Sequence, residues 1–130
     1  RANELAEFVS TAARKYDFDL DALIAVGYSN GANIASAMML LGALKASGAI
    51  LFRPMVPLSR PEEHALDNCE VLISGGRFDP IATSSQVNAL AKLLRERRAK
   101  VDVRMQESGH ELTDRDVEIA RDWLAPSAVA

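Results

Sequence analysis

The sequence has few of the side chains that hold metals or form covalent cross-links. Its 130 residues include one cysteine and two histidines, so no disulfide can form within the chain and a metal site has no support. Cys69 precedes the apolar residues 71–73, where a cysteine is most often a small buried hydrophobe. We therefore expect a structural role for Cys69, and neither a metal nor a cofactor.

The sequence also lacks a membrane span, an export signal and an excess of positive charge. No stretch approaches the roughly 20 consecutive apolar residues of a spanning helix, and no basic-then-apolar signal segment opens the chain. The net charge of −3 argues against a nucleic-acid or anionic-membrane partner, which favours a basic surface. These absences predict a cytoplasmic protein whose partner is a small molecule.

Apolar residues are nevertheless abundant enough for the core of one domain, since they make up 48% of the chain. Short apolar runs predict strands at residues 22–28, 48–52 and 70–74, and an alternation of apolar and polar residues predicts a fourth at 101–105. Helices are predicted at residues 3–16 and 32–41, after Thr83, and from about 113 to 124.

Strands separated by helices are typical of βαβ units, which build a parallel sheet with helices on both faces. The alternating strand has one wet face, so we expect it at an edge of the sheet. The helix at 32–41 is apolar almost all round, which indicates burial, with Met38 and Met39 as core residues and Gly42 as its stop. Three prolines predict a loop or broken helix over residues 53–68.

Two further local patterns concern the later helices. Thr83 and Gln86 have the spacing of a capping box before a helix that buries Val87, Leu90, Ala91 and Leu94. The last helix is expected to face the core with Val117, Ala120, Trp123 and Leu124. His64 lies in a polar stretch without a partner by spacing, so we expect it to be exposed.

Residues 27–31 (GYSNG) match the G-x-S-x-G nucleophile elbow, a sharp turn from a strand into a helix with a serine at its apex. The serine of such an elbow has a strained conformation, and the residues two positions to either side must be tiny. Gly27 and Gly31 fill those positions. An ordinary strand-to-helix turn is the simpler interpretation, but the apolar strand before Ser29 and the helix after it are the context that an elbow needs.

Three reactive side chains follow predicted strands: Ser29 after the first, Asp79 after the third and His110 after the fourth. In a parallel sheet such groups gather beyond the carboxyl ends of the strands. Their order along the chain is the order expected of α/β hydrolases. Each has a structural alternative, because a serine can cap a helix, an aspartate before proline can form a turn, and a histidine can lie in a surface loop. Together they predict a catalytic triad.

At these residues the chain resembles the α/β-hydrolase superfamily, and within it the bacterial carboxylesterase/phospholipase group, which includes acyl-protein thioesterase-like enzymes. The resemblance is carried by residues 27–35, 74–80 and 108–110. It implies that Ser29 is the nucleophile, His110 the general base and acid, and Asp79 the group that orients the imidazole. The backbone N–H of Asn30 is then one of two oxyanion donors. The related dienelactone hydrolases use cysteine, so the serine argues against them.

The resemblance predicts a serine hydrolase of carboxylesterase type that cleaves an ester through an acyl-serine intermediate. The same triad acting as a thioesterase or lysophospholipase, or on amides, is a near alternative, because all of these reactions proceed through one acyl-enzyme. A hydrolase-fold binding module without turnover is the more distant one. Tyr28, Met55 and Ile81 are candidates for the apolar lining of the substrate pocket, or else belong to the core.

Members of this group carry several strands and the second oxyanion donor before the helix at which this chain begins. We therefore expect residues 1–130 to form the C-terminal part of a single α/β-hydrolase domain, with the N-terminal half in the same or another chain. A homodimer is left open as a further partner. Loss of one oxyanion donor typically costs about a hundredfold or more in turnover, so this piece alone is not expected to be fully active.

Overall fold

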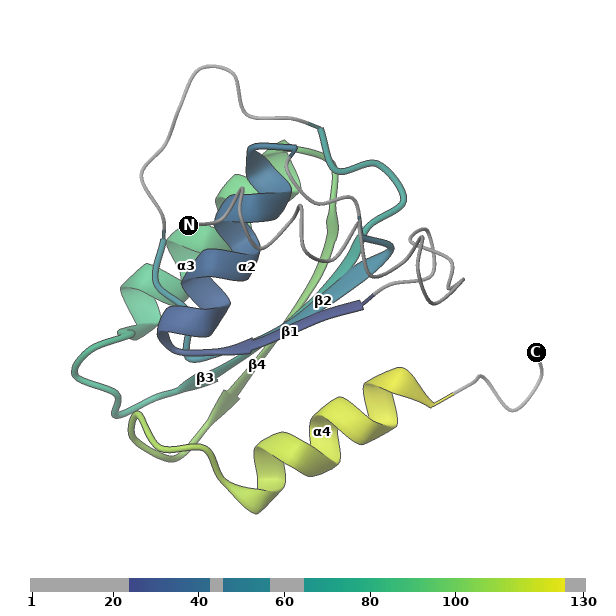
Figure 1. The fold of residues 1–130 in the computed structure, drawn as a ribbon. Helices are drawn as coiled ribbons and strands as arrows, with labels where there is room; N and C mark the ends of the chain where they lie inside the picture. The colour runs from purple at the N-terminus through teal and green to yellow at the C-terminus, as the bar shows by residue number, and fades with distance from the viewer. Residues whose placement is uncertain (1–23, 43–45, 57–64, 126–130) are drawn as a thin grey trace.

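The computed structural model describes residues 24–42, 46–56 and 65–125. Within them four strands form one parallel sheet in the order β1-β2-β3-β4 (Figure 1). The elements are β1 (Ile24–Tyr28), α2 (Asn30–Leu40), β2 (Gly48–Phe52), β3 (Glu70–Gly76), α3 (Ser84–Glu96), β4 (Lys100–Gln106) and α4 (Asp114–Leu124). The predicted helix at 3–16, the loop residues 57–64 and His64 lie outside the described residues.

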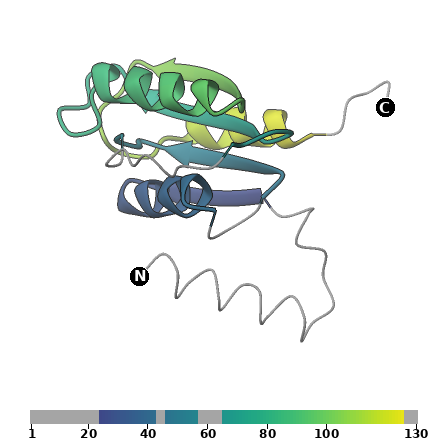
Figure 2. The same ribbon diagram turned by 90° about the horizontal axis from the view of Figure 1, so that it is seen from above.

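Helices cover both faces of the sheet, as the alternation of strand and helix predicted. On one face α2 contacts β1 and β2 while α3 contacts β3 and β4, and Figure 2 shows the two helices side by side over their halves of the sheet. The opposite face carries α4. Successive strand residues point to opposite faces, so Leu51 and Ile73 pack in the larger core with α2 and α3, whereas Ile50 and Leu72 pack beneath α4.

The two edges of the described sheet differ. β4 lies at one edge, as its alternating pattern predicted, and its side chains are half-buried or exposed. β1 lies at the other edge and pairs only with β2 within the described residues. Ala25 packs against the larger core, but Val26 on the other face is 61% exposed. The sequence predicted an apolar first strand with an unpaired far edge. Among the described residues, β1 is such a strand, because no described strand pairs with its far edge.

The helices α2 and α3 agree with most of the predictions made for them. Met38 and Met39 are buried in the core, and Gly42 ends α2 with a φ of 71°, in the left-handed region that glycine adopts readily. The four residues predicted to face inward from α3 are all buried. The capping box is only half present, however, because Thr83 accepts from the Gln86 N–H while the Gln86 side chain instead accepts from the Val56 N–H at 3.1 Å.

The predicted inward face of α4 is wrong in part. Ala120 is buried and Trp123 packs against the smaller core, but Val117 and Leu124 are 44% and 48% exposed. The inward stripe instead runs through Asp116, Ile119, Ala120 and Trp123. The prediction assumed that only apolar residues of α4 face inward. Asp116 also faces inward, because it forms an ion pair with the buried Arg53, and the inward face therefore differs from the predicted one.

Candidate active site

Ser29 forms the turn between β1 and α2 and has a φ of 55° and a ψ of −116°. This pair of angles lies outside the regions that residues with a side chain ordinarily adopt, which indicates backbone strain of a kind that is frequent at functional sites. The Ser29 N–H donates to the Phe52 carbonyl at 2.8 Å, which ties the turn to the end of β2. The hydroxyl makes no capping hydrogen bond to α2, so Ser29 is not a side-chain cap.

Of the two glycines around Ser29, the structure requires only the first to be small. A Cβ atom on Gly27 would lie 2.5 Å from the backbone carbon of Gly31, because the first turn of α2 passes directly over β1. A Cβ atom on Gly31 meets nothing within 4 Å. Among the described residues, the expectation for Gly31 is therefore not supported, since it lies on the exposed side of that turn.

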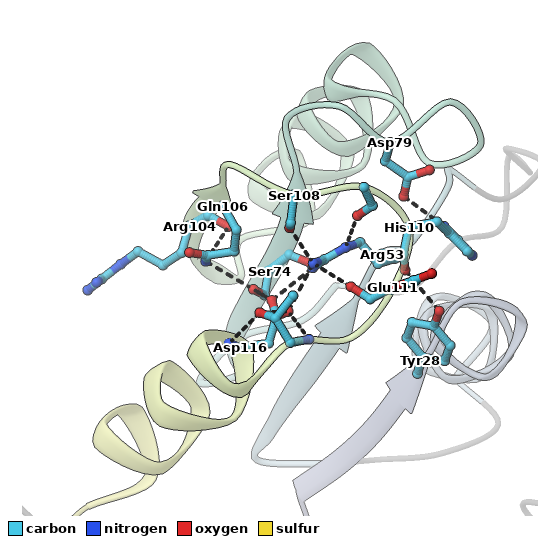
Figure 3. Close-up of polar contacts among 12 residues, drawn as sticks. Tyr28, Arg53, Ser74, Asp79, Arg104, Gln106, Ser108, His110, Glu111 and Asp116 are labelled. Carbon is cyan, nitrogen blue, oxygen red and sulfur yellow. Dashed lines mark hydrogen bonds and ion pairs between the residues drawn. The ribbon is translucent and has the colours of Figure 1, made fainter.

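The three predicted side chains meet beyond the carboxyl ends of the strands. The Ser29 hydroxyl oxygen lies 2.8 Å from Nε2 of His110, and Nδ1 of the same ring lies 2.7 Å from Oδ2 of Asp79. Figure 3 shows the second of these contacts. Serine, imidazole and carboxylate thus form a continuous hydrogen-bonded chain, in which the neutral imidazole can accept the serine proton while it donates to the carboxylate.

Asp79 is held as a carboxylate. It is 4% exposed, and its Oδ1 accepts from the N–H groups of Ile81 and Ala82 at 2.7 and 3.0 Å. Burial raises the pKa of a carboxyl group, but the hydrogen bonds from His110 and from the two backbone groups outweigh it and hold the pKa of Asp79 below its ordinary value. The turn-forming alternative and the triad therefore coexist, because one oxygen serves the turn and the other serves the imidazole.

His110 lies in the connection between β4 and α4, residues 107–113, of which we call residues 107–112 the His110 loop. The loop is fastened to the end of β3, since the Phe78 N–H donates to the Ser108 carbonyl at 3.0 Å. A Cβ atom on Gly76 would lie 2.1 Å from the Gly109 carbonyl oxygen, so only glycine allows this approach. The close contact places the Asp79 turn and the His110 loop side by side.

The remaining predicted site residues lie around the triad. Tyr28 donates its hydroxyl to the His110 carbonyl at 2.8 Å, and the two rings have centroids 5.6 Å apart. Asn30 is the first residue of α2. Met55 is half-buried and its N–H donates to the Asn33 side chain at 2.8 Å, while Ile81 is exposed beside Asp79. That Tyr28, Met55 and Ile81 line a substrate pocket stays a prediction.

One polar group beside the triad was missed in the sequence. Arg53 and Asp116 are both fully buried and form a two-pronged ion pair, with nitrogen–oxygen distances of 2.8 and 2.9 Å. Burial raises the pKa of Asp116, but hydrogen bonds from Arg53, Ser74 and Thr113 outweigh this effect and hold the pKa below its ordinary value. Thr113 and Asp116 also form a full capping box on α4. The Thr-x-x-Asp spacing could have indicated this cap, whereas nothing in the pattern around Arg53 indicates burial.

Some other kinds of site have no counterpart in the described segments. Residues 24–42, 46–56 and 65–125 contain no group of three or more His, Cys, Asp or Glu side chains that could hold a metal ion. No helix in these segments is long and apolar enough to cross a membrane. Cys69 is buried as expected, and burial raises the pKa of its thiol, which disfavours the reactive thiolate.

Comparisons with known proteins agree with this arrangement. The sequence model of the dienelactone hydrolase family matches residues 2–125. MhqD of Bacillus subtilis (strain 168), a protein named as a hydrolase, is 38% identical over 129 residues, which are 99% of this chain and 64% of the relative. The crystal structure of a Bacillus cereus carboxylesterase has a TM-score of 0.89 and 38% identity, over 94% of this chain and 57% of that one.

A carboxylesterase of Mesorhizobium loti is similarly close, with a TM-score of 0.86 and 38% identity over 97% of this chain and 60% of that structure. The chain therefore belongs to the dienelactone hydrolase family and has the α/β-hydrolase fold, but it spans only 57 to 64% of the length of these relatives. Family membership corrects the argument against dienelactone hydrolases, because a serine at the elbow does not place a chain outside this family.

Proposed function

We propose that this chain carries the catalytic triad of a serine hydrolase of carboxylesterase type, which cleaves a carboxylic ester through an acyl-serine intermediate. The observation that carries the proposal is the unbroken chain of hydrogen bonds from Ser29 through His110 to Asp79, 2.8 and 2.7 Å long. The elbow gives it further support, since the strained backbone angles of Ser29 are of the kind found at active-site residues.

In the proposed reaction the Ser29 oxygen attacks the carbonyl carbon of the ester, and its proton passes to Nε2 of His110. The imidazolium then gives that proton to the leaving alcohol as the carbon–oxygen bond breaks. Water, deprotonated by the same nitrogen, attacks the acyl carbon; the bond from that carbon to the Ser29 oxygen then breaks, the imidazolium returns the proton to this oxygen, and the carboxylic acid leaves. Asp79 keeps the Nδ1 proton in place and stabilises the imidazolium throughout.

The negative oxygen of each tetrahedral intermediate needs donors that are already in place. Asn30 is the first residue of α2, so its N–H has no carbonyl partner within the helix and is the first donor in our proposal. The second donor stays a prediction for the N-terminal part of the domain, which the relatives' greater length leaves room for.

The ester preference follows from the names of the similar structures, two of which are carboxylesterases. The family name adds cyclic esters to the range, because a dienelactone is an ester closed into a ring. A thioester or an amide can enter the same acyl-serine pathway, and no contact in the site favours either of them over an ester.

The test uses the longest natural polypeptide that contains this chain, mixed with p-nitrophenyl acetate, butyrate and octanoate in separate assays. We expect an initial release of about one equivalent of p-nitrophenol, followed by slower turnover, and an acyl adduct on the peptide that contains Ser29. Ser29→Ala is the control and should show neither. A folded protein that neither hydrolyses these esters nor carries an adduct contradicts the proposal and favours the binding module.

A further inference from the structure

Behind the triad lies a polar cluster that the proposed chemistry does not use. Its centre is Arg53, which directly follows β2 and whose side chain is fully buried. Figure 3 shows its guanidinium group between the His110 loop and the start of α4. We propose that Arg53 is a positioning residue, which holds the His110 loop so that the imidazole stays within hydrogen-bond distance of Ser29. The inference rests on the proposed function and assigns a further residue to that site.

Every part of the guanidinium group that faces the loop makes a hydrogen bond with it. Nε donates to the Gly109 carbonyl at 2.9 Å, and Nη2 donates to the Ser108 hydroxyl and to the Glu111 carbonyl, both at 3.0 Å. The carbonyl between them, that of His110, accepts from the Tyr28 hydroxyl. Three consecutive carbonyl groups are thus held by side chains, which tie the backbone of His110 to the ends of β1 and β2.

The opposite side of the guanidinium group is fixed to the body of the domain. Nη1 donates to Asp116 and to the Ser74 carbonyl at 3.0 Å. Asp116 is fixed in turn by the Ser74 hydroxyl and by the Thr113 N–H and hydroxyl. Burial raises the pKa of Asp116, but these hydrogen bonds lower it below its ordinary value, so the carboxylate stays charged. Arg53 therefore connects a rigid anchor to a loop that otherwise has no helix or strand structure.

A merely structural role explains this arrangement less well than a positioning role. Replacing a buried ion pair with apolar side chains is often neutral or stabilising, so such a pair is weak evidence of a contribution to stability. The planar fork of arginine, with five N–H donors, is the one side chain that can bind a carboxylate and several carbonyl groups together. Lysine keeps the charge next to Asp116 but cannot reach the same acceptors.

The substitution that separates the two roles is therefore Arg53→Lys. We expect the variant to fold, because the charge pair remains, and to lose about ten- to a hundredfold in kcat for p-nitrophenyl butyrate with KM unchanged. The downfield proton signal of the His110 Nδ1–H, which Asp79 accepts, should broaden or shift. A fold-stabilising arginine predicts normal kcat and an unchanged signal in the folded variant.

Arg98 offers a matched control. It also has a left-handed backbone, with a φ of 74° against 54° for Arg53, and it also pairs with an aspartate, Asp67, at 3.0 Å. Both side chains of that pair are exposed, and Arg98 precedes β4, at the end of the strands opposite to the triad. Arg98→Lys should therefore keep the wild-type kcat and the wild-type imidazole signal.

The experiment uses the longest natural polypeptide that contains this chain, with folding of each variant checked by circular dichroism. A folded Arg53→Lys with wild-type kcat and signal overturns the inference. If that variant does not fold, Ser108→Ala decides, since it removes one contact of Arg53 without touching the ion pair; a fall of about threefold in kcat supports the inference and no fall overturns it. If the wild type forms no acyl-enzyme, the proposed function fails, and the imidazole signal alone then tests Arg53.

Discussion

The Ser29 elbow, residues 27–31, and the His110 loop meet at two hydrogen bonds, from Ser29 to the His110 ring and from Tyr28 to the His110 carbonyl, but different contacts hold the two regions in place. The loop has no regular structure and is held by polar contacts from Arg53, Tyr28 and the turn after β3. The elbow is held by its backbone, with one hydrogen bond from the Ser29 N–H and a steric contact over Gly27. Side-chain hydrogen bonds therefore hold the histidine in addition to the close contact at Gly76, whereas the serine is held by its own backbone.

Their surroundings differ in the same sense. The loop follows β4 and lies against β3, whose residues from Val71 to Gly76 are buried. The elbow begins with the last two residues of β1, an edge strand of the described sheet whose residues alternate between half-buried and exposed. Among the described residues, the histidine side of the site therefore adjoins a buried strand and the serine side adjoins an exposed one. Substitutions on the two sides should therefore differ in kind.

The largest expected effect falls on both sides equally, because the two regions act as one unit in the chemistry. Ser29→Ala and His110→Ala should each lower kcat for ester hydrolysis by about 10⁶-fold in the longest natural polypeptide. The double variant should be no worse than either single one, as measured by initial rates with p-nitrophenyl butyrate. Losses that add on a logarithmic scale contradict the proposal that Ser29 and His110 act in a single step.

A steric test breaks the elbow alone. Gly27→Ala places a methyl group 2.5 Å from the Gly31 backbone, so we expect it to lower the free energy of unfolding by about 1–3 kcal/mol, as overpacking does. Gly31→Ala is the matched control, because its methyl group meets open space, and it should change this free energy by less than about 1 kcal/mol. Urea unfolding of the two variants measures both. Equal effects contradict the account of the elbow.

Acid should affect the His110 side, which contains both carboxyl groups with a lowered pKa. Asp79 and Asp116 have folded-state pKa values below their ordinary value of 3.8. A group of this kind adds stability that is present above the unfolded pKa and is lost as the pH falls through the folded pKa. Urea midpoints should therefore be insensitive to these groups from pH 7 to 5 and fall below pH 3.8, less steeply in Asp116→Asn. An equal slope in that variant contradicts the assignment.

The smallest effect is expected on the exposed face of β1. Val26→Thr changes a side chain that is 61% exposed and keeps its β-branch, so it should change the free energy of unfolding by about 0.5 kcal/mol or less. Val71→Thr makes the same change at a fully buried strand position and places an unpaired hydroxyl in the core, which should cost about 1–3 kcal/mol. Urea unfolding of residues 1–130 compares them. A large loss at Val26 indicates that another segment covers it.

The sequence allowed the prediction of features that depend on local pattern. Apolar runs indicated three strands within about two residues, alternation placed β4 at an edge, and the glycines around Ser29 indicated the elbow. The positions of Ser29, Asp79 and His110, each after a predicted strand, predicted their meeting because parallel strands end at the same edge of a sheet. These inferences need only periodicity and topology.

The features that were missed depend on contacts between distant residues. Arg53 was predicted to begin a proline-rich loop or broken helix, and only its ion pair with Asp116, far along the chain, makes its burial tolerable. The same ion pair explains why the predicted inward face of α4 was wrong in part. That prediction used apolar residues only, whereas Asp116 also lies on the inward face. The Gln86 side chain likewise does not complete the predicted capping box, because it accepts a hydrogen bond from the Val56 N–H, 30 residues earlier in the chain. Local spacing could not indicate any of these partners.

The central claim is that His110 activates the Ser29 hydroxyl, and labelling with a fluorophosphonate tests it most directly. The longest natural polypeptide that contains this chain is treated with the reagent, its intact mass is measured, and the adduct is located by peptide sequencing. We expect one adduct, on Ser29, in the wild type and none in His110→Ala under the same conditions. An unlabelled folded wild type, or an adduct of equal yield without His110, contradicts the claim.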